Sequence, residues 1–245
     1  MSPRLRKKNR LSRGESVVYD VNNHNWINES INRLKDNILY WGLDNDKKVV
    51  QVESSISGEA KTTTTVNLAV SLGASGRKVV IVDLDFRKPR VHRPFSIENV
   101  NGLGDYLLDK IDINEAIKKT SYENVYICNR GSDIQSSSFI LTSEKMNNFI
   151  KYLRERFDFV LLDSPPVLMI SDYIHISRLS DGVIFNIASG RTKKNQVKEA
   201  INLLKNNNIN IIGAVFTFYN PDSSYRGDYY GYGKDYYSKG YGDEK

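Results

Sequence analysis

The sequence lacks the features of disulfide-bonded, membrane-spanning, secreted and zinc-binding proteins. Cys128 is the single cysteine among 245 residues, so no disulfide can form within one chain. No apolar run approaches the roughly 18 residues of a transmembrane helix, and no apolar segment follows the basic N-terminus as in a secretory signal. We find no zinc-ligand spacing and no continuous basic face, which argues against nucleic-acid binding. We therefore expect a globular protein that does not itself span a membrane.

The residues that are present fit one large α/β domain. Hydrophobic residues make up 40% of the chain and charged residues 26%, which is ordinary for a globular protein. Continuous apolar runs alternate with helical patterns over residues 48–218, which predicts a doubly wound, mostly parallel sheet. Amphipathic helices are expected over residues 25–41, 142–157 and 193–206. The expected strands are residues 48–54, 78–84, 124–129, 157–163, 181–188 and 210–218.

Composition divides the chain into three regions. Residues 1–23 form a basic arm, with six of its positive charges in the first thirteen residues. Such an arm is either solvated or in contact with anionic lipid or an acidic partner. Residues 24–218 form the expected domain. Residues 219–245 form a tail with eight of the fifteen tyrosines and no Leu, Ile, Val, Ala, Met or Phe. This tail cannot fold alone, and it is either a phosphate acceptor or a sticky aromatic segment.

A phosphate-binding loop is partly recognisable after the first expected strand. Lys61 and Thr62 stand where the template GxxxxGK[ST] has its phosphate lysine and its magnesium hydroxyl. Gly58 is present, but Ser55 and Ala60 occupy the two template glycines. The backbone N–H groups of such a loop surround phosphate oxygens at a helix N-terminus. A methyl group at position 60 disfavours the positive φ that such loops use, and an ordinary helix-start loop remains the alternative.

Carboxylates end two further strand runs. Asp83 closes one apolar run, and Asp85 follows two residues later; Asp163 closes another run and precedes Ser-Pro-Pro. Two carboxylates at one strand tip are costly unless a cation lies beside them, and Mg²⁺ is the natural choice. Each aspartate alone could instead cap a turn or a helix. The order and spacing of the three motifs favour a nucleotide site.

Together the motifs resemble the bacterial tyrosine kinases (BY-kinases) of capsule and exopolysaccharide operons. The resemblance covers residues 25–245 and is carried by SSISGEAKTT, VDLDFRKP, LLDSPPV, GLGDYLL, SDYIHISRLSDGV and the tyrosine cluster. It implies a single α/β P-loop domain. It also implies transfer of the γ-phosphoryl group of ATP to tyrosine, mostly on the tail of a neighbouring subunit.

The resemblance implies a role for each matching residue. Lys61 would neutralise the phosphates, and Asp83 would orient and deprotonate the incoming phenol. The ligands of Mg²⁺ would be Thr62, Asp85 and Asp163. The nucleotide-binding residues would be Gly58, Glu59, Ala60, Lys61, Thr62, Thr63 and Thr217. The acceptor tyrosines would be Tyr225, Tyr229, Tyr230, Tyr232, Tyr236, Tyr237 and Tyr241.

The resemblance also implies partners. A helix motif for ring assembly would place Glu29, Asn32 and Lys35 at a contact between subunits, and the tail would enter a neighbour's active site. The other partners would be a transmembrane adaptor that activates the kinase and a tyrosine phosphatase. The protein would then be cytoplasmic and peripheral at the inner face of the membrane.

Two other hypotheses stay open, and the first of them rests on four departures from the family pattern. Ala60 replaces a glycine, Thr217 replaces an adenine-reading Asn, two arginines of the ring motif are missing, and residues 134–141 replace an Asn-Pro-rich segment. A weakened kinase, or an inactive scaffold phosphorylated by an active relative, is therefore one alternative. The other is a partitioning or septum-positioning ATPase. That class has a signature lysine five residues before the P-loop lysine, where this chain has Ile56.

Overall fold

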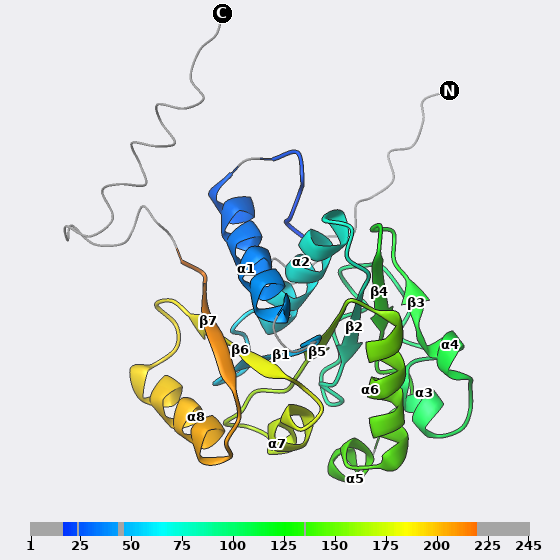
Figure 1. Ribbon diagram of the computed structural model, residues 1–245. Helices are drawn as coiled ribbons and strands as arrows, with labels where there is room; N and C mark the ends of the chain where they lie inside the picture. Colours follow the sequence, from blue (N-terminus) through cyan, green and yellow to red (C-terminus); the bar gives the residue numbers. More distant parts are fainter. Residues whose placement is uncertain (1–16, 24, 44–46, 135, 220–245) are drawn as a thin grey trace, which may run out of the picture.

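A single sheet organises the computed structural model, which describes residues 17–23, 25–43, 47–134 and 136–219. Its strands are β1 (Val49–Ser54), β2 (Val79–Asp83), β3 (Lys118–Lys119), β4 (Val125–Cys128), β5 (Phe159–Asp163), β6 (Gly182–Ala188) and β7 (Ile211–Thr217). Their order across the sheet is β3-β4-β2-β5-β1-β6-β7 (Figure 1). The short β3 is antiparallel to β4, and the other pairings are parallel. The predicted fold class is confirmed.

Helices cover both faces of the sheet (Figure 1). They are α1 (Trp26–Leu43), α2 (Lys61–Ala74), α3 (Leu103–Leu107), α4 (Ile113–Ala116), α5 (Ser137–Leu141), α6 (Glu144–Arg156), α7 (Asp172–Ser177) and α8 (Lys194–Asn206). α1 and α2 pack on one face, and α6, α7 and α8 pack on the other. Each predicted strand run and each predicted helix is present, with its ends shifted by a few residues. The two-residue β3 was not predicted, because Lys-Lys has no strand pattern.

The alternation of side chains in β2 shows how the two layers form. Val79 and Ile81 lie in the core beneath α1 and α2, whereas Val80 and Val82 lie in the core beneath α6. All four are fully buried. Complete burial of such a side chain stabilises the fold by about 1.5–3 kcal/mol. A strand that is apolar on both faces must be covered twice, which explains the continuous runs in the sequence.

α6 follows directly from its sequence. Ser143 caps it, because its Oγ accepts a hydrogen bond from the N–H of Met146 at 3.1 Å. Glu144 lies in the first turn, and Arg154 and Arg156 lie in the last, as the helix dipole favours. The buried residues of the helix have the spacing of one helical face: Met146, Phe149, Ile150 and Leu153.

The chain before α1 lies against α2. The N–H groups of Val18 and Tyr19 donate to Asn67 Oδ1 at 2.7 and 2.9 Å. Asn28 Nδ2 donates to the carbonyl of Asp20 at 2.7 Å. Part of the predicted arm therefore contacts the domain. Residues 1–16 and 220–245 lie outside the described residues, and with them lie the basic cluster of the arm and the seven predicted acceptor tyrosines.

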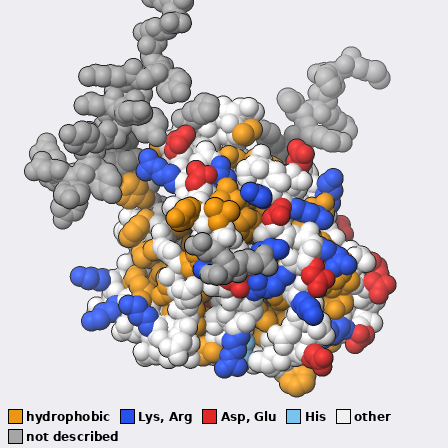
Figure 2. Space-filling model, in the orientation of Figure 1, with side chains coloured by type: hydrophobic (Ala, Val, Ile, Leu, Met, Phe, Trp, Pro, Cys, Tyr) orange, Lys and Arg blue, Asp and Glu red, His pale blue; other side chains and the backbone are white. Residues whose placement is uncertain are grey.

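The described surface carries mixed charges. Figure 2 shows basic and acidic side chains interspersed over one face, with hydrophobic side chains gathered in its left part. Phe216 in β7 and Phe218 just after it are 64% and 41% exposed. None of the described helices has both the length and the apolar character that crossing a membrane requires.

Candidate active site

The topology brings the three predicted motifs to one edge of the sheet. The carboxyl ends of parallel strands lie at the same edge, which is where ligands bind in such folds. In the register of the sheet, Asp83 of β2 lies opposite Asp163 of β5. Ser54, the last residue of β1, lies opposite Asn186 of β6. The P-loop that follows β1 is therefore flanked by the aspartates on one side and by β6 on the other.

The P-loop uses left-handed backbone at two positions. Gly58 has φ 86°, and Ala60 has φ 62° and ψ 29° at the start of α2. The N–H of Thr64 donates to the Ala60 carbonyl at 2.9 Å, which begins the helix. A residue with a Cβ atom in this conformation costs about 1–2 kcal/mol. The expectation from the sequence, that position 60 needs a positive φ which Ala disfavours, agrees with this geometry.

Glu59 directs its carboxylate into the protein. Its side chain is 1% exposed. Oε2 accepts from the N–H of Ile56 at 2.8 Å, and Oε1 accepts from the N–H of Ala188 at 3.2 Å. The hydroxyl of Thr192 donates to the same Oε1. The side chain thus ties the P-loop to the end of β6, and any contact of Glu59 with a nucleotide falls to its backbone.

The backbone carbonyl of Glu59 accepts hydrogen bonds from side chains of β6 and β7. Thr217 Oγ1 donates to it at 3.1 Å and Asn186 Nδ2 at 3.3 Å. Asn186 Nδ2 is also 2.7 Å from Thr64 Oγ1. Thr217, which the resemblance places at the adenine, therefore lies beside the P-loop with its hydroxyl engaged by protein. The sequence reasoning missed Asn186, although a buried amide inside the apolar run 182–188 is a signal that could have identified it.

The first turn of α2 contacts Asp163. Thr62 Oγ1 donates to Asp163 Oδ2 at 2.6 Å, and Thr65 Oγ1 is 3.4 Å from Asp163 Oδ1. Two predicted metal ligands, Thr62 and Asp163, are thus in direct contact. Thr65 was not predicted, because nothing distinguishes it within the run of four threonines. Thr63 is half-buried in the same turn, and its carbonyl accepts from Asn67 Nδ2 at 2.8 Å.

Lys61 lies folded over the end of β1. Its Nζ donates to Ser54 Oγ at 3.0 Å, and the residue is 8% exposed. Beneath it lies Glu53, which is fully buried and accepts from Gln51 Nε2 at 2.7 Å. Burial raises the pKa of Glu53 to about 8, although the nearby charge of Lys61 opposes the shift. The sequence reasoning did not consider Glu53.

The three predicted aspartates share one electrostatic environment. Asp83 is fully buried, and its Oδ2 accepts from the N–H groups of Arg90 and Val91 at 2.9 and 3.0 Å. Burial, and next the charge of Asp163, raise the pKa of Asp83 well above its usual range. Burial likewise raises the pKa of Asp163 to about 6. Asp85 lies two residues beyond β2, half-buried, and its charge adds to both shifts.

These residues fit a magnesium ion that arrives with a nucleotide. Within the described ranges, no group of three or more His, Cys, Asp or Glu side chains is arranged to hold a metal by itself. Mg²⁺ is usually bound through one or two carboxylates together with substrate phosphates. Asp83 Oδ1 is buried and has no hydrogen-bond partner, and Asp163 lies opposite. A cation there would relieve the repulsion between the two carboxylates.

Unpartnered polar atoms surround the P-loop. Three buried side-chain atoms without a hydrogen-bond partner in the described structure lie at or near the carboxyl ends of β1, β2 and β6. They are Ser55 Oγ, Asp83 Oδ1 and Asn186 Oδ1. Such atoms are rare in folded proteins and call for a ligand, an ion or a water. Their gathering around one loop is what a polar, charged ligand would explain.

The predicted assembly motif lies on α1. Asn32 Oδ1 accepts from the hydroxyl of Tyr19 at 3.0 Å. Lys35 Nζ is 3.4 Å from Asp36 Oδ1 and 3.5 Å from Asn32 Oδ1. Glu29 lies in the first turn of the helix and is half-buried. At least two of the three side chains therefore make contacts within the chain, and their part in assembly stays a prediction.

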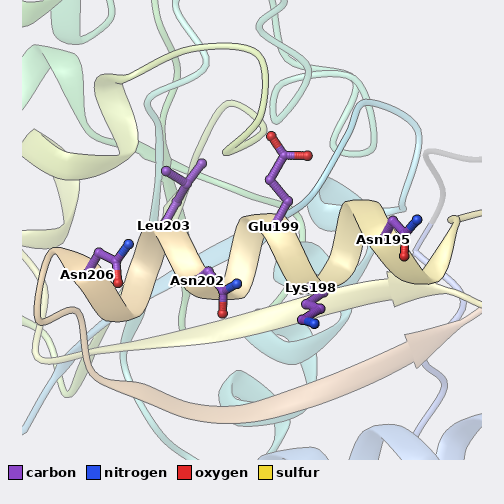
Figure 3. A pocket seen from close by; sticks show the side chains of 6 residues that line it. All are labelled: Asn195, Lys198, Glu199, Asn202, Leu203 and Asn206. Carbon is purple, nitrogen blue, oxygen red and sulfur yellow. The ribbon is translucent and has the colours of Figure 1, made fainter.

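A hollow of about 290 Å³ lies elsewhere, along α8. Figure 3 shows the six side chains that line it, all on that one helix: Asn195, Lys198, Glu199, Asn202, Leu203 and Asn206. None of them belongs to the P-loop or to the strand ends described above. We therefore give this hollow no part in the candidate active site.

Known proteins share this fold and these motifs. Residues 47–212 match the family model of the AAA domain. The chain is similar to the tyrosine-protein kinase YwqD of Bacillus subtilis (strain 168), with 31% identity over 210 residues that make up 85% of this chain and 89% of the relative. Among solved structures, it is similar to the chimerical protein CapA2B2, with a TM-score of 0.75, 28% identity and coverage of 79% of this chain and 85% of that one.

A second structural relative comes from another class of P-loop ATPase. The septum site-determining protein MinD of Pyrococcus horikoshii, complexed with Mg-ADP, has a TM-score of 0.59, 27% identity and coverage of 69% of each chain. The likeness to CapA2B2 is thus greater, and the identity with YwqD extends over most of both chains. The chain belongs to the family of bacterial tyrosine-protein kinases built on a P-loop AAA domain.

Proposed function

We propose that this protein is an ATP-dependent protein-tyrosine autokinase of capsular or exopolysaccharide synthesis, which phosphorylates the tyrosine cluster of a neighbouring copy. The observation that supports this most is the convergence of Asp83 and Asp163 beside the P-loop, with buried polar atoms that lack partners around them. That arrangement suits a nucleotide with its cation, and family membership gives the class of reaction.

The chemistry needs little beyond positioning and charge neutralisation. The phenol oxygen of an acceptor tyrosine forms a bond to the γ-phosphorus, the bond from that phosphorus to the bridging oxygen of ADP breaks, and the phenol proton passes to Asp83. Asp83, whose buried Oδ1 has no hydrogen-bond partner in the described structure, would accept this proton from a phenol of pKa about 10 as the general base.

The other site residues would hold the nucleotide. Lys61 would swing from Ser54 to the phosphates, and the loop from Gly58 to Thr63 would surround them with backbone N–H groups. Thr62, Asp85 and Asp163 would hold Mg²⁺, which when bound supplies positive charge against the phosphate oxygens. Thr217 would lie near the adenine.

The partners follow the family pattern. A transmembrane adaptor would recruit and activate the kinase at the inner face of the membrane, and a tyrosine phosphatase would reverse the modification. α1, through Glu29, Asn32 and Lys35, would contribute to assembly with other copies. Each added phosphate brings about −1.5 to −2 charges at pH 7, so a phosphorylated tail would leave an active site lined by aspartates.

Two observations favour a second candidate, a scaffold with weak or no catalysis. Ala60 holds a strained conformation that glycine would adopt freely, and the hydroxyl of Thr217 is engaged by the P-loop carbonyl. Both features could lower affinity for ATP. In that case the tail would be phosphorylated by an active relative.

The deciding experiment is incubation of the purified full-length protein with Mg-ATP, followed by detection of phosphotyrosine. We expect signal in the wild type and none in Lys61→Met or Asp83→Asn. Signal in the wild type only after an active relative is added would support the scaffold. Nucleotide-dependent dimerisation with ATP hydrolysis but no phosphotyrosine would support a partitioning ATPase instead.

A further inference from the structure

The loop after β2 folds back over the catalytic candidate Asp83. The N–H of Lys88 donates to Asp85 Oδ1 at 3.0 Å, and the N–H groups of Arg90 and Val91 donate to Asp83 Oδ2. Phe86 and Val91, at either end of this segment, are buried. The loop is thus fixed at both ends and runs over the surface between them.

A second contact anchors the same loop. Arg130, after β4, donates from NH1 to the carbonyl of Phe86 at 3.0 Å and pairs with Asp133 at 3.1 Å. The backbone between Phe86 and Val91 is therefore held from two strands. The backbone positions of residues 87 and 88 are thereby set relative to Asp83.

The side chains that this loop presents are basic. Residues 86–93 read FRKPRVHR, with four Lys or Arg residues and no Asp or Glu. Arg87 and Lys88 are exposed, and neither forms an ion pair with another residue in the part of the chain that the structure describes. They stand four and five residues beyond Asp83, on the loop that folds back onto it. Positive charge on a loop whose backbone contacts Asp83 and Asp85 favours an acidic substrate.

The tyrosine cluster contains a matching pattern. The triplet Asp-Tyr-Tyr occurs twice, at residues 228–230 and 235–237. Tyr229 and Tyr236 are thereby the two predicted acceptors that directly follow an acidic residue. By contrast, Tyr225 follows Ser and Tyr232 follows Gly. Successive side chains of an extended chain point to opposite faces and their Cα atoms are about 3.3–3.8 Å apart, so an acceptor phenol placed at Asp83 would leave the preceding carboxylate at the mouth of the site, turned away from the phenol.

We propose that Arg87 and Lys88 determine acceptor specificity by binding the carboxylate directly before the tyrosine, so that Tyr229 and Tyr236 are phosphorylated first. The inference rests on the proposed kinase function and narrows its substrate class to tyrosines preceded by Asp. Exposed ion pairs are weak. We therefore expect a preference of about three- to tenfold in initial rate, which shrinks at high salt because exposed charges are screened.

The test separates enzyme from substrate. Catalytic amounts of full-length wild-type protein act on tagged full-length Lys61→Met protein, whose own transfer is blocked. Mass spectrometry then measures initial phosphorylation at each tail tyrosine. The readout is the ratio of the combined rate at Tyr229 and Tyr236 to that at Tyr225 and Tyr232. Because this ratio is formed within one reaction, it does not depend on the overall activity of a variant.

Matched variants test whether Arg87 and Lys88 cause the preference for Tyr229 and Tyr236. The double change Arg87→Gln with Lys88→Gln in the enzyme should bring the ratio close to one. Arg77→Gln, an exposed arginine after the far end of α2, should leave it unchanged. The double change Asp228→Asn with Asp235→Asn is made in the substrate, at positions outside the described residues. It should lower the ratio by the same factor. Combining the enzyme and substrate changes should lower the ratio no further, because both remove the same contact.

Two results would overturn this inference and leave the kinase function standing. One is equal phosphorylation of the four tyrosines, and the other is a ratio that either double variant leaves unchanged. The basic loop would then serve only to balance the charge of the nearby aspartates. Absence of phosphate from every tyrosine overturns both this inference and the proposed kinase function.

Discussion

Asp83 and Asp163 lie directly opposite each other at the ends of the neighbouring parallel strands β2 and β5, and both are buried. The charge of Asp163 is the second cause, after burial, of the raised pKa of Asp83. Two carboxyl groups in such a position cannot both ionise cheaply without a cation. The folded state therefore carries a local cost that a functional ligand would remove.

Asp83→Asn should separate stability from function. The amide oxygen can still accept from the N–H groups of Arg90 and Val91, and the amide group replaces an unpartnered oxygen beside Asp163. We expect nucleotide-free protein to gain about 1–3 kcal/mol of unfolding free energy, measured by urea denaturation, while phosphotyrosine formation is lost. Asp85→Asn, at a half-buried position, should change stability less. A large loss of stability in Asp83→Asn would contradict this account of the pair.

Ala60→Gly should stabilise the folded P-loop. Glycine adopts a φ of 62° without the steric cost that Ala carries. Because the loop holds this φ without a nucleotide, relief of about 1 kcal/mol should appear as a gain of that size in the free energy of unfolding, measured by urea denaturation. Ala74→Gly at the end of α2, where the backbone is helical, should give no such gain. If neither wild type nor Ala60→Gly binds ATP at millimolar concentration, the scaffold function replaces the kinase.

Glu59 should be a positioning residue of the P-loop. Glu59→Ala leaves the buried N–H groups of Ile56 and Ala188 without acceptors, and each such loss costs about 1–3 kcal/mol. We expect a lower melting temperature and weaker ATP binding. Glu59→Gln keeps one acceptor oxygen and should lie between Glu59→Ala and the wild type. Equal effects of the two substitutions would indicate that the negative charge, and not the hydrogen bonds, matters.

Glu53 should make stability depend on pH. Its pKa rises on folding from 4.5 to about 8, so between these values the folded protein holds a proton that the unfolded chain has released. Raising the pH through this window therefore favours unfolding. The stabilisation is complete below about pH 4.5 and lost above about pH 8. Between pH 5.5 and 8 the unfolding free energy should fall by about 1–3 kcal/mol more in wild type than in Glu53→Gln.

The control for this pH effect is Glu123→Gln, since Glu123 is exposed. That variant should keep the pH slope of the wild type. A wild-type slope in Glu53→Gln would show that Glu53 is not the group that titrates.

Thr217 should weaken the discrimination between adenine and guanine nucleotides. Its single hydroxyl is donated to the Glu59 carbonyl, whereas an amide could both donate to and accept from a base. We expect GTP to compete with ATP within about tenfold in the wild type, and Thr217→Asn to widen that gap. Competition binding with a fluorescent ATP analogue measures it. An unchanged ratio in Thr217→Asn would remove Thr217 from base recognition.

The strands, the main helices and the chemistry at the strand ends could be predicted from the amino-acid sequence. Apolar runs such as residues 79–83 are local, and they predict buried strands wherever they lie. Lys61, Thr62, Asp83 and Asp163 could be selected because their residue types and spacing suit phosphate and magnesium. The strain at position 60 could be predicted because a positive φ is disfavoured by any side chain with a Cβ atom, whatever the rest of the fold.

Which strand ends lie side by side could not be predicted, because it depends on the order of the strands in the folded sheet. The pairing of Asp83 with Asp163 depends on β2 lying beside β5, and the contacts of Asn186 depend on β6 lying beside β1. The direction of the Glu59 side chain likewise depends on β6 and on the segment after it. The contacts of Asn186 and of the Glu59 side chain join residues more than a hundred positions apart, and Asp83 and Asp163 are 80 positions apart. No local pattern records them, because the order of strands in a sheet is set by how its helices pack on both faces.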